Sequence, residues 1–164
     1  MITFTPVTIG ACIHIAKNMR ERDRVEVEAV LGLSDPVDIG YNMGRAHGYT
    51  GAAGFVCKLD NESVAVMTAT FETPKSVQVA LIATDDFNSV ALAVSRKIKR
   101  EVIPDLIARG VTRAECRCWE DHTDARRWLA ILGAVEECNI PLYGGNGETF
   151  IQMAWRLPDV HERT

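Results

Sequence analysis

Several side chains that can transfer protons lie at the ends of expected strands, where binding sites are often built. Glu115 lies on one expected strand and Glu72 ends another, and either carboxylate can act as a general base. Glu120 and His122 follow the strand that carries Glu115, and Tyr143 precedes a glycine-rich turn that fits either a plain hairpin or a substrate lid. An imidazole or a phenol can protonate a leaving group. These residues are the expected catalytic set of an acid–base reaction.

Each carboxylate and the histidine also have a structural interpretation. Glu115 and Arg117 share a strand face, so they can form an ion pair on a solvated surface. Glu72 fits an ordinary carboxylate at a strand end, and Glu120 fits a solvated loop. His122 fits a helix cap or a partly buried imidazole, and the catalytic alternative is an imidazole that titrates near neutral pH.

The histidines and cysteines show no metal-ligand spacing. His14, His47 and His161 have no His, Cys or carboxylate at ligand spacing, and Cys116-x-Cys118 is neither a CxxC pair nor a zinc pattern. We expect no metal site, and we expect reduced, mostly buried thiols in a cytoplasmic setting.

The composition is that of an ordinary globular protein. The 164 residues are 47% hydrophobic and 24% charged, with a net charge of −4. This length buries a core without disulfides, so we expect a single domain over residues 1–164. The mild negative charge disfavours nonspecific nucleic-acid or membrane binding. No apolar run reaches the ~18 residues of a spanning helix, and the N-terminus lacks the basic start of a signal peptide.

The first half of the chain predicts helices followed by a meander of strands. A strand over 1–7 precedes a helix capped by Thr8, and a charged helical segment over 20–31 ends at Gly32. Asp35-Pro36 predicts the start of a short helix that ends at Gly48. Antiparallel strands are then expected over 55–59, 64–71 and 77–84, the last of them central and buried on both faces.

The second half predicts a strand–helix–strand unit and a final hairpin. A long helix over 90–109 contains Pro104, which predicts a kink or an early break. A strand follows over 113–119, with Ala114, Cys116 and Cys118 on one face. Thr123 or His122 caps the next helix, and strands over 135–142 and 149–157 are joined by a turn at 144–147. The order is β-α-α-β-β-β-α-β-α-β-β, a mixed α+β protein.

This order resembles the GNAT superfamily of acyl-CoA-dependent N-acetyltransferases. The segment from His122 to Glu136 is similar to the family's fourth-helix motif, Asn-x-x-Ala-x-x-x-Tyr-x-x-x-Gly-Phe, with Ala125 and Gly133 in register. The resemblance implies a mostly antiparallel sheet of six to seven strands flanked by about four helices. A narrower resemblance, to acetyltransferase-like and internal virion proteins of tailed phages, rests on the Ala-Thr-Asp-Asp run at 83–86 and the segment 127–134. It implies host cytoplasm or a virion as the location.

The resemblance implies an acetyl-CoA site between the strands over 77–84 and 113–119. The pantetheine arm would lie between these strands, and the pyrophosphate would lie at the start of the long helix. The implied cofactor-binding residues are Ile82, Ala83, Thr84, Phe87, Asn88, Ser89, Val90 and Arg126. The family's loop carries glycines at this position, whereas this chain has none between Gly54 and Gly110 and instead carries Asp85 and Asp86.

The implied reaction is direct attack of a neutral amine on the acetyl thioester. Backbone N–H groups near 82–84 would hold the carbonyl, and Glu115, Glu72 or Glu120 would accept the amine proton. The acceptor would be a small-molecule or protein amine, and a homodimer is common in the superfamily. Leu129 stands at the position of the family's tyrosine acid. This departure favours the alternative, a protein of the same fold with lost or altered chemistry that serves as a virion component or partner-binding protein.

Overall fold

The computed structural model describes residues 1–161, in which one seven-stranded sheet has the strand order β1-β2-β3-β4-β5-β7-β6. Most neighbouring strands are antiparallel, and only β4 and β5 are parallel. The strands are β1 (Ile2–Thr5), β2 (Gly51–Leu59), β3 (Glu62–Thr73), β4 (Ser76–Ala83), β5 (Arg113–Trp119), β6 (Val135–Ile140) and β7 (Phe150–Arg156). The expected meander is confirmed as β2, β3 and β4, and β4 has the expected central position in the sheet.

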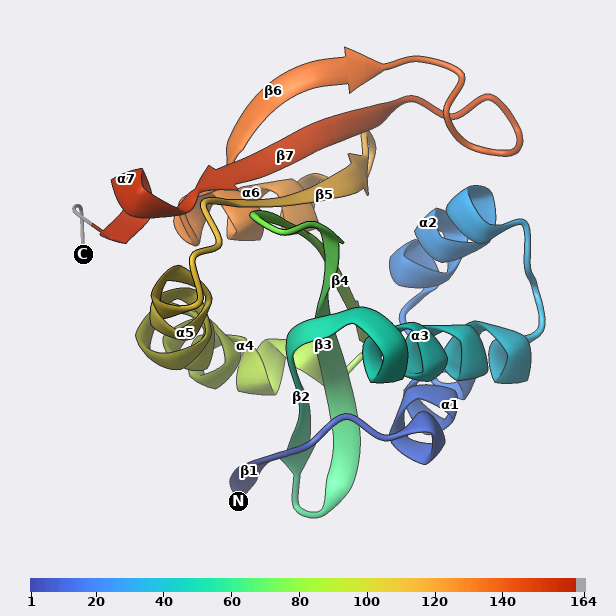
Figure 1. Ribbon diagram of the computed structural model, residues 1–164. Helices are drawn as coiled ribbons and strands as arrows, with labels where there is room; N and C mark the ends of the chain where they lie inside the picture. The colour runs from blue at the N-terminus through green and yellow to red at the C-terminus, as the bar shows by residue number, and fades with distance from the viewer. Residues whose placement is uncertain (162–164) are drawn as a thin grey trace.

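Helices cover the sheet on two sides, with α1–α3 on one side and α4–α6 on the other (Figure 1). Three helices precede β2, where the predicted order has two, because the charged segment over 20–31 forms a helix of its own. No helix in the described range is long and apolar enough to cross a membrane. The helices are α1 (Ile9–Lys17), α2 (Glu21–Leu31), α3 (Pro36–Thr50), α4 (Phe87–Lys97), α5 (Ile103–Ala108), α6 (Thr123–Ile131) and α7 (Leu157–His161).

The predicted caps at Thr8 and Asp35 and the predicted stop at Gly32 are present, whereas the side chain of His122 makes no cap bond at the start of α6. The Ala11 N–H donates to Thr8 Oγ1 at the start of α1, and the Val37 N–H donates to Asp35 Oδ1 at the start of α3. Gly32 ends α2 with a φ of 65°, a left-handed conformation that glycine adopts without strain. α3 continues past Gly48 to Thr50, because Gly48 has no positive φ and stays helical.

Helices α1 and α3 cross at two glycines. A Cβ on Gly40 would lie 2.5 Å from both the Cα and the N of Ile13, and a Cβ on Gly44 would lie 3.0 Å from the Cα of Ile9. Gly40 and Gly44 are buried and are spaced one helical turn apart. The crossing therefore depends on the absence of side chains at these two positions.

The long helix after β4 widens before Pro104 and continues. A π-helical segment over Ile98–Val102 separates α4 from α5, and Pro104 is the second residue of α5. Proline has no N–H to donate and its ring clashes with the carbonyl four residues earlier, so a wider turn removes this conflict. The predicted perturbation at Pro104 is present as this widened segment.

Two apolar clusters pack on opposite faces of the sheet. The larger one joins the sheet to α4 and α5, and the smaller one joins α1 and α3 to Val56, Val66 and Ile82. The prediction that β4 is buried on both faces is wrong for its middle part. Val77 is fully buried, but Ala80 is exposed and Val79 and Leu81 are half-buried, because they line a cavity.

Strand β6 forms an open edge of the sheet. It pairs only with β7, and a bulge at Glu137 shifts the register between Glu136 and Cys138. Glu137 binds Arg113 and Arg156, and Glu136 binds Arg126. The edge therefore carries ordered charges along its length.

Candidate functional site

The parallel strands β4 and β5 pair over three residues and then separate. Their pairing covers Ser76 to Gln78 of β4, and the rest of both strands is unpaired with the other. We call the space between 79–83 and 116–119 the β4–β5 gap. A cavity of about 670 Å³ extends through this gap and is lined from both sides of the sheet. Its volume lies within the range of ligand pockets.

Strand β4 presents unpaired backbone groups to the gap. The Thr84 N–H donates to Val64 O on β3, whereas the Ala83 N–H points the other way, to Asp23 of α2. Because N–H directions alternate along a strand, the N–H groups of Val79 and Leu81 point into the gap. An extended ligand that carries amides can therefore pair with β4 as an added strand.

The start of α4 lies at the mouth of the same cavity. Asp86 is the N-cap residue but makes no side-chain cap bond, and both Asp85 and Asp86 are exposed. Asn88 lines the cavity beside Phe87. The first-turn N–H groups of an α-helix attract anions, so this corner can bind a phosphate group.

Two carboxylates of α2 reach the open end of the gap, one toward each strand. The Ala83 N–H of β4 donates to Asp23 Oδ2 at 2.8 Å, and the Trp119 N–H of β5 donates to Glu26 Oε2 at 2.9 Å. The chain before α2 is fixed to β4 as well, because the Arg20 N–H donates to Ala83 O at 2.9 Å. Helix α2 is thus held across the gap by polar contacts.

His122 lies between these two carboxylates. Its Nδ1 is 3.2 Å from Glu26 Oε2, and its Nε2 is 3.8 Å from Asp23 Oδ1. His122 and Asp23 are almost fully buried, and Glu26 is half-buried. Burial raises the pKa of Asp23, while the ion pair with Arg20 and the bond from the Ala83 N–H act in the opposite direction.

Four polar side chains line the cavity, from β3, β4, β5 and the loop between β6 and β7. They are Glu72, Gln78, Arg117 and Tyr143. The Arg117 guanidinium stacks over the Tyr143 ring at 5.4 Å, and no described residue bonds to Arg117 Nε or to Gln78 Oε1, both of which are buried. Unsatisfied buried polar atoms are costly, so they favour a polar ligand at this position.

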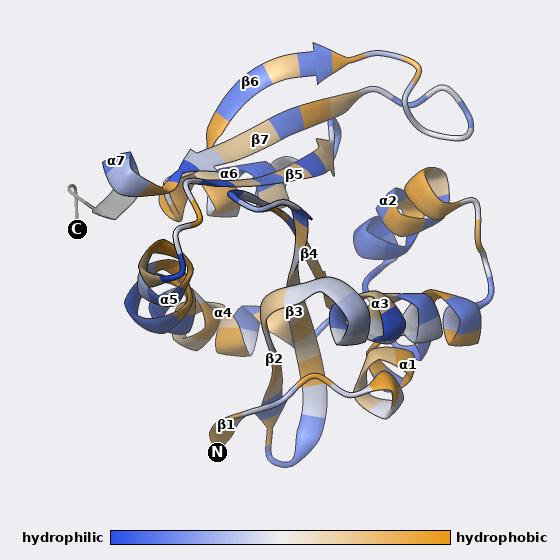
Figure 2. Cartoon of the chain, in the orientation of Figure 1, coloured by the Kyte–Doolittle hydropathy of each residue, from blue (hydrophilic) through white to orange (hydrophobic). Residues whose placement is uncertain are grey.

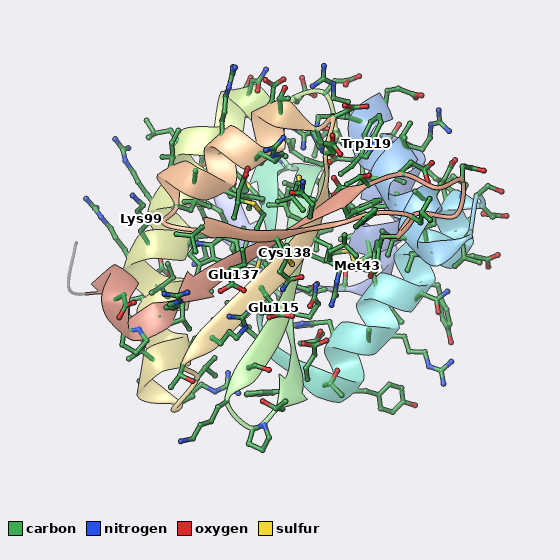
Figure 3. All side chains as sticks on the ribbon, turned by 90° about the horizontal axis from the view of Figure 1, so that it is seen from above. Met43, Lys99, Glu115, Trp119, Glu137 and Cys138 are labelled. Atoms are coloured by element: carbon green, nitrogen blue, oxygen red, sulfur yellow. The ribbon has the colours of Figure 1, made fainter. Side chains whose placement is uncertain are left out.

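The structure divides the sequence-predicted catalytic residues into two groups. Glu72, His122 and Tyr143 line the cavity. Glu115 binds Arg113, and Figure 3 shows it beside Glu137, which binds the same arginine. Glu120 is exposed, and its carbonyl accepts a bond from Arg126. Glu115 and Glu120 are not among the residues that line the cavity within the described range.

The predicted cofactor residues are divided in the same way. Ile82, Phe87 and Asn88 line the cavity, Ser89 is exposed at the start of α4, and Val90 is fully buried in the core. Arg126 binds Glu136. The expectation that N–H groups at 82–84 hold a carbonyl needs correction, because Ala83 and Thr84 already donate to Asp23 and Val64, and Ile82 points toward β3. Val79 and Leu81 are the N–H groups that face the gap.

Comparison with known proteins gives matches among solved structures. No protein-family model matches the chain, and no curated protein sequence matches it significantly. A ribosomal-protein-alanine N-acetyltransferase from Escherichia coli superposes with a TM-score of 0.71 at 16% identity, covering 96% of this chain and 94% of that one. The chain has the GNAT fold. The expected fold class is confirmed.

Two further GNAT-fold structures agree over nearly the whole length. The protein yncA from Salmonella typhimurium, solved with acetyl-CoA, gives a TM-score of 0.69 at 15% identity and covers 95% of this chain and 94% of its own. A spermidine N-acetyltransferase variant from Vibrio cholerae gives 0.68 at 13% identity, covering 99% and 97%. None of the structures named here is described as a phage protein, so that narrower resemblance stays a prediction.

Sequence reasoning missed the carboxylates of α2. Asp23 and Glu26 are spaced three apart in a densely charged helix, which is typical of a solvated face. Asp23 and Ala29 are instead the buried members of α2, while Val30 and Leu31 are exposed, and the C-terminal end of α2 has the hydrophobic colour in Figure 2. No local pattern in α2 therefore marks Asp23 as buried.

The cysteine thiols lead to a chemical prediction. Burial raises the pKa of Cys12 and Cys57 to about 11 and that of Cys116 to about 12, and burial together with Glu26 raises that of Cys118. A thiol with a pKa of about 11 is only about 0.1% thiolate at pH 8. Cys138 is exposed, so iodoacetamide should label it at least about tenfold faster than the others.

Mass spectrometry of the native and the urea-unfolded chain checks this order of reactivity. All five cysteines are free, so the unfolded chain should take up five labels. Rapid native labelling of Cys12 or Cys116 would contradict the burial described above.

Proposed function

We propose that this chain is an acetyl-CoA-dependent N-acetyltransferase. The observation that carries the proposal is the β4–β5 gap, in which a strand edge of β4 opens onto a cavity of about 670 Å³ at the start of α4. The pantetheine arm carries amides and can pair with the Leu81 backbone as an added strand. The pyrophosphate would lie at the first turn of α4, next to Asn88.

The reaction follows from this placement. The amine nitrogen attacks the thioester carbonyl carbon, an N–C bond forms, and the C–S bond breaks to release the CoA thiolate. The Val79 N–H, which lies farther from the start of α4 than the Leu81 N–H, stabilises the oxygen of the tetrahedral intermediate. Glu72 lines the cavity, so we assign it as the base that accepts the amine proton, and we assign the Tyr143 hydroxyl as the acid that protonates the thiolate.

The experiment that tests the proposal is a thermal-shift titration with acetyl-CoA, using free CoA and ATP as comparisons. A ligand at a hundredfold excess over its Kd stabilises the native state by about 2.7 kcal/mol. For a chain of this length that corresponds to roughly 5–10 °C in Tm. A saturable shift with acetyl-CoA, followed by acetylation of an amine in a mass-spectrometric screen, supports the proposal. No shift at millimolar ligand contradicts it.

A change at Glu72 should affect the chemical step. Glu72→Gln removes a general base while keeping the size of the side chain, so kcat should fall about 10²-fold or more. Glu115→Gln is the matched control, because that carboxylate binds Arg113. Steady-state rates of both variants check the prediction. An unchanged kcat in Glu72→Gln would remove Glu72 as the base.

The acceptor should carry an anionic group near its amine. Arg117 lines the cavity, has no carboxylate within ion-pair distance among the described residues, and leaves its buried Nε without a bond. Arg117→Gln should therefore raise KM for a carboxylate-bearing amine about 10–100-fold, since charge-assisted hydrogen bonds are worth about 1.5–3 kcal/mol. KM for an uncharged amine of the same size should not change. Equal effects on both acceptors would contradict this assignment.

The second candidate function is partner binding by a protein of the same fold that lacks transferase chemistry, as the resemblance to phage virion proteins implies. The observation in its favour is the pair of bonds from Ala83 and Trp119 to the α2 carboxylates, which narrow the gap where the cofactor would enter. Failure of acetyl-CoA to stabilise the chain is the result that favours this candidate. The free thiols favour a reducing compartment such as the cytoplasm for either function.

A further inference from the structure

Three side chains from separate elements bring metal-ligand atoms together at the open end of the β4–β5 gap. These are Glu26 of α2, Cys118 of β5 and His122 at the start of α6, whose ligand atoms all lie within 4.8 Å of one another. We propose that they bind a divalent transition-metal cation, with Zn²⁺ as the best match. The proposal does not rest on acetyl transfer.

Two of the three separations between these ligand atoms match tetrahedral zinc. With Zn–N and Zn–O bonds of about 2.1 Å and a Zn–S bond of about 2.3 Å, tetrahedral ligands lie about 3.4 Å apart for N and O and about 3.6 Å apart for S and O. The observed distances are 3.2 Å from His122 Nδ1 to Glu26 Oε2 and 3.6 Å from Cys118 Sγ to Glu26 Oε2. The third separation, from the Cys118 thiol to the His122 ring, is below 4.8 Å.

The residues around the cluster orient the ligands. Without a metal, His122 Nδ1 lies at hydrogen-bond distance from Glu26 Oε2, 3.2 Å. A cation on Nδ1 would replace the proton of that contact, and Nε2 would then carry the ring proton toward Asp23 Oδ1, which lies 3.8 Å away. Arg20 binds Asp23 through both carboxylate oxygens, and the Trp119 N–H fixes Glu26. A carboxylate behind a ligating imidazole is the usual arrangement in zinc sites.

The three protein ligands would leave one coordination position of the metal free. One thiolate, one imidazole and one carboxylate supply three bonds, and all three side chains line the cavity, so the fourth position faces space that a water or a ligand atom can occupy. Sulfur and nitrogen ligands select zinc-like cations over Mg²⁺ and Ca²⁺, which prefer oxygen. The bound cation would connect α2, β5 and α6.

Cobalt substitution tests the proposal on the full-length chain. The EDTA-treated protein is titrated with Co²⁺, which reports tetrahedral geometry through its visible bands and thiolate ligation through a near-ultraviolet charge-transfer band. We expect one Co²⁺ per chain, both spectral features, and displacement of Co²⁺ by Zn²⁺. Absence of cobalt binding at 100 μM metal, or a purely octahedral spectrum, would overturn the proposal.

Variants identify the ligands. Cys118→Ser should abolish the charge-transfer band, whereas Cys116→Ser and Cys138→Ser, both cysteines outside the cluster, should leave it intact. Asp23→Asn should weaken Zn²⁺ binding about 10–100-fold, as is typical of partners behind a metal-bound histidine. Circular dichroism confirms the fold of each variant, and the intact chain gives a result even if a variant fails to fold. A charge-transfer band that persists in folded Cys118→Ser would overturn the assignment.

Metal binding and acetyl-CoA binding are measured separately, so one proposal can be contradicted while the other is supported. The cobalt spectrum needs no acetyl donor, and the acetyl-CoA titration is run with and without one equivalent of Zn²⁺. Loss of the acetyl-CoA shift in both conditions contradicts the proposed function and leaves the metal site supported if the cobalt spectrum is present.

Discussion

Gly40→Ala should lower the melting temperature by about 6–12 °C. A Cβ at this position would lie 2.5 Å from the backbone of Ile13, and backbone atoms cannot yield as a flexible side chain can. Helices α1 and α3 would have to separate along their whole contact. Overpacking of a core costs about 1–3 kcal/mol, and we place this contact at the upper end because the obstacle is backbone.

Gly48→Ala is the matched control for this change. Gly48 lies in the same helix, and a Cβ there meets nothing within 4 Å. Alanine is the better helix former by about 1 kcal/mol, so this variant should be slightly more stable than the parent chain. Differential scanning calorimetry of both variants checks the pair. Equal melting temperatures would show that the α1–α3 crossing tolerates a side chain.

Asp23→Ala should destabilise the fold by about 3–5 kcal/mol, the cost of removing one partner from a buried ion pair. The change leaves the Arg20 guanidinium and the Ala83 N–H without their acceptor. It also removes the contact that fixes α2 to β4. We therefore expect faster hydrogen exchange in α2 and at the end of β4 than in β2 and β3.

Glu28→Ala tests whether the destabilisation expected in Asp23→Ala comes from the burial of Asp23 and not from the loss of a negative charge on α2. Glu28 is also on α2 and pairs with Arg24 one turn away on a more exposed face. Surface pairs of this kind contribute about 0.3–0.5 kcal/mol. Urea unfolding of both variants, with exchange mass spectrometry, gives the comparison. Equal losses in the two variants would contradict the buried role of Asp23.

The sequence predicted the fold where local chemistry decides it. Thr8 and Asp35 accept cap bonds whose donors are fixed by helix geometry, and Gly32 and Gly133 adopt positive φ values at helix ends. The alternation of Ala114 with its strand neighbours was sufficient to assign one face of β5. Such features depend on residues within a few positions of one another.

The remaining features depend on contacts between distant segments. The pairing between β4 and β5 ends after Gln78. No pattern in the sequence marks this point, because both strands continue as regular strands beyond it. Gly40 and Gly44 lower helix propensity when considered alone, yet they are buried where α1 crosses. Asp23 and Glu26 belong to the site only because Met19 pairs with Thr84 and directs α2 across the gap.

The open edge at β6 has a consequence for solubility. Unpaired edge strands promote edge-to-edge association, and charges and bulges oppose it. Glu136 and Glu137 place two carboxylates on this edge, with the bulge beside them. The bond from Arg113 lowers the pKa of Glu137, so this carboxylate keeps its charge to a lower pH than a free glutamate does. The exposed Cys138 can crosslink two chains under oxidising conditions. Storage with a reductant should therefore keep the protein free of disulfide-linked aggregates.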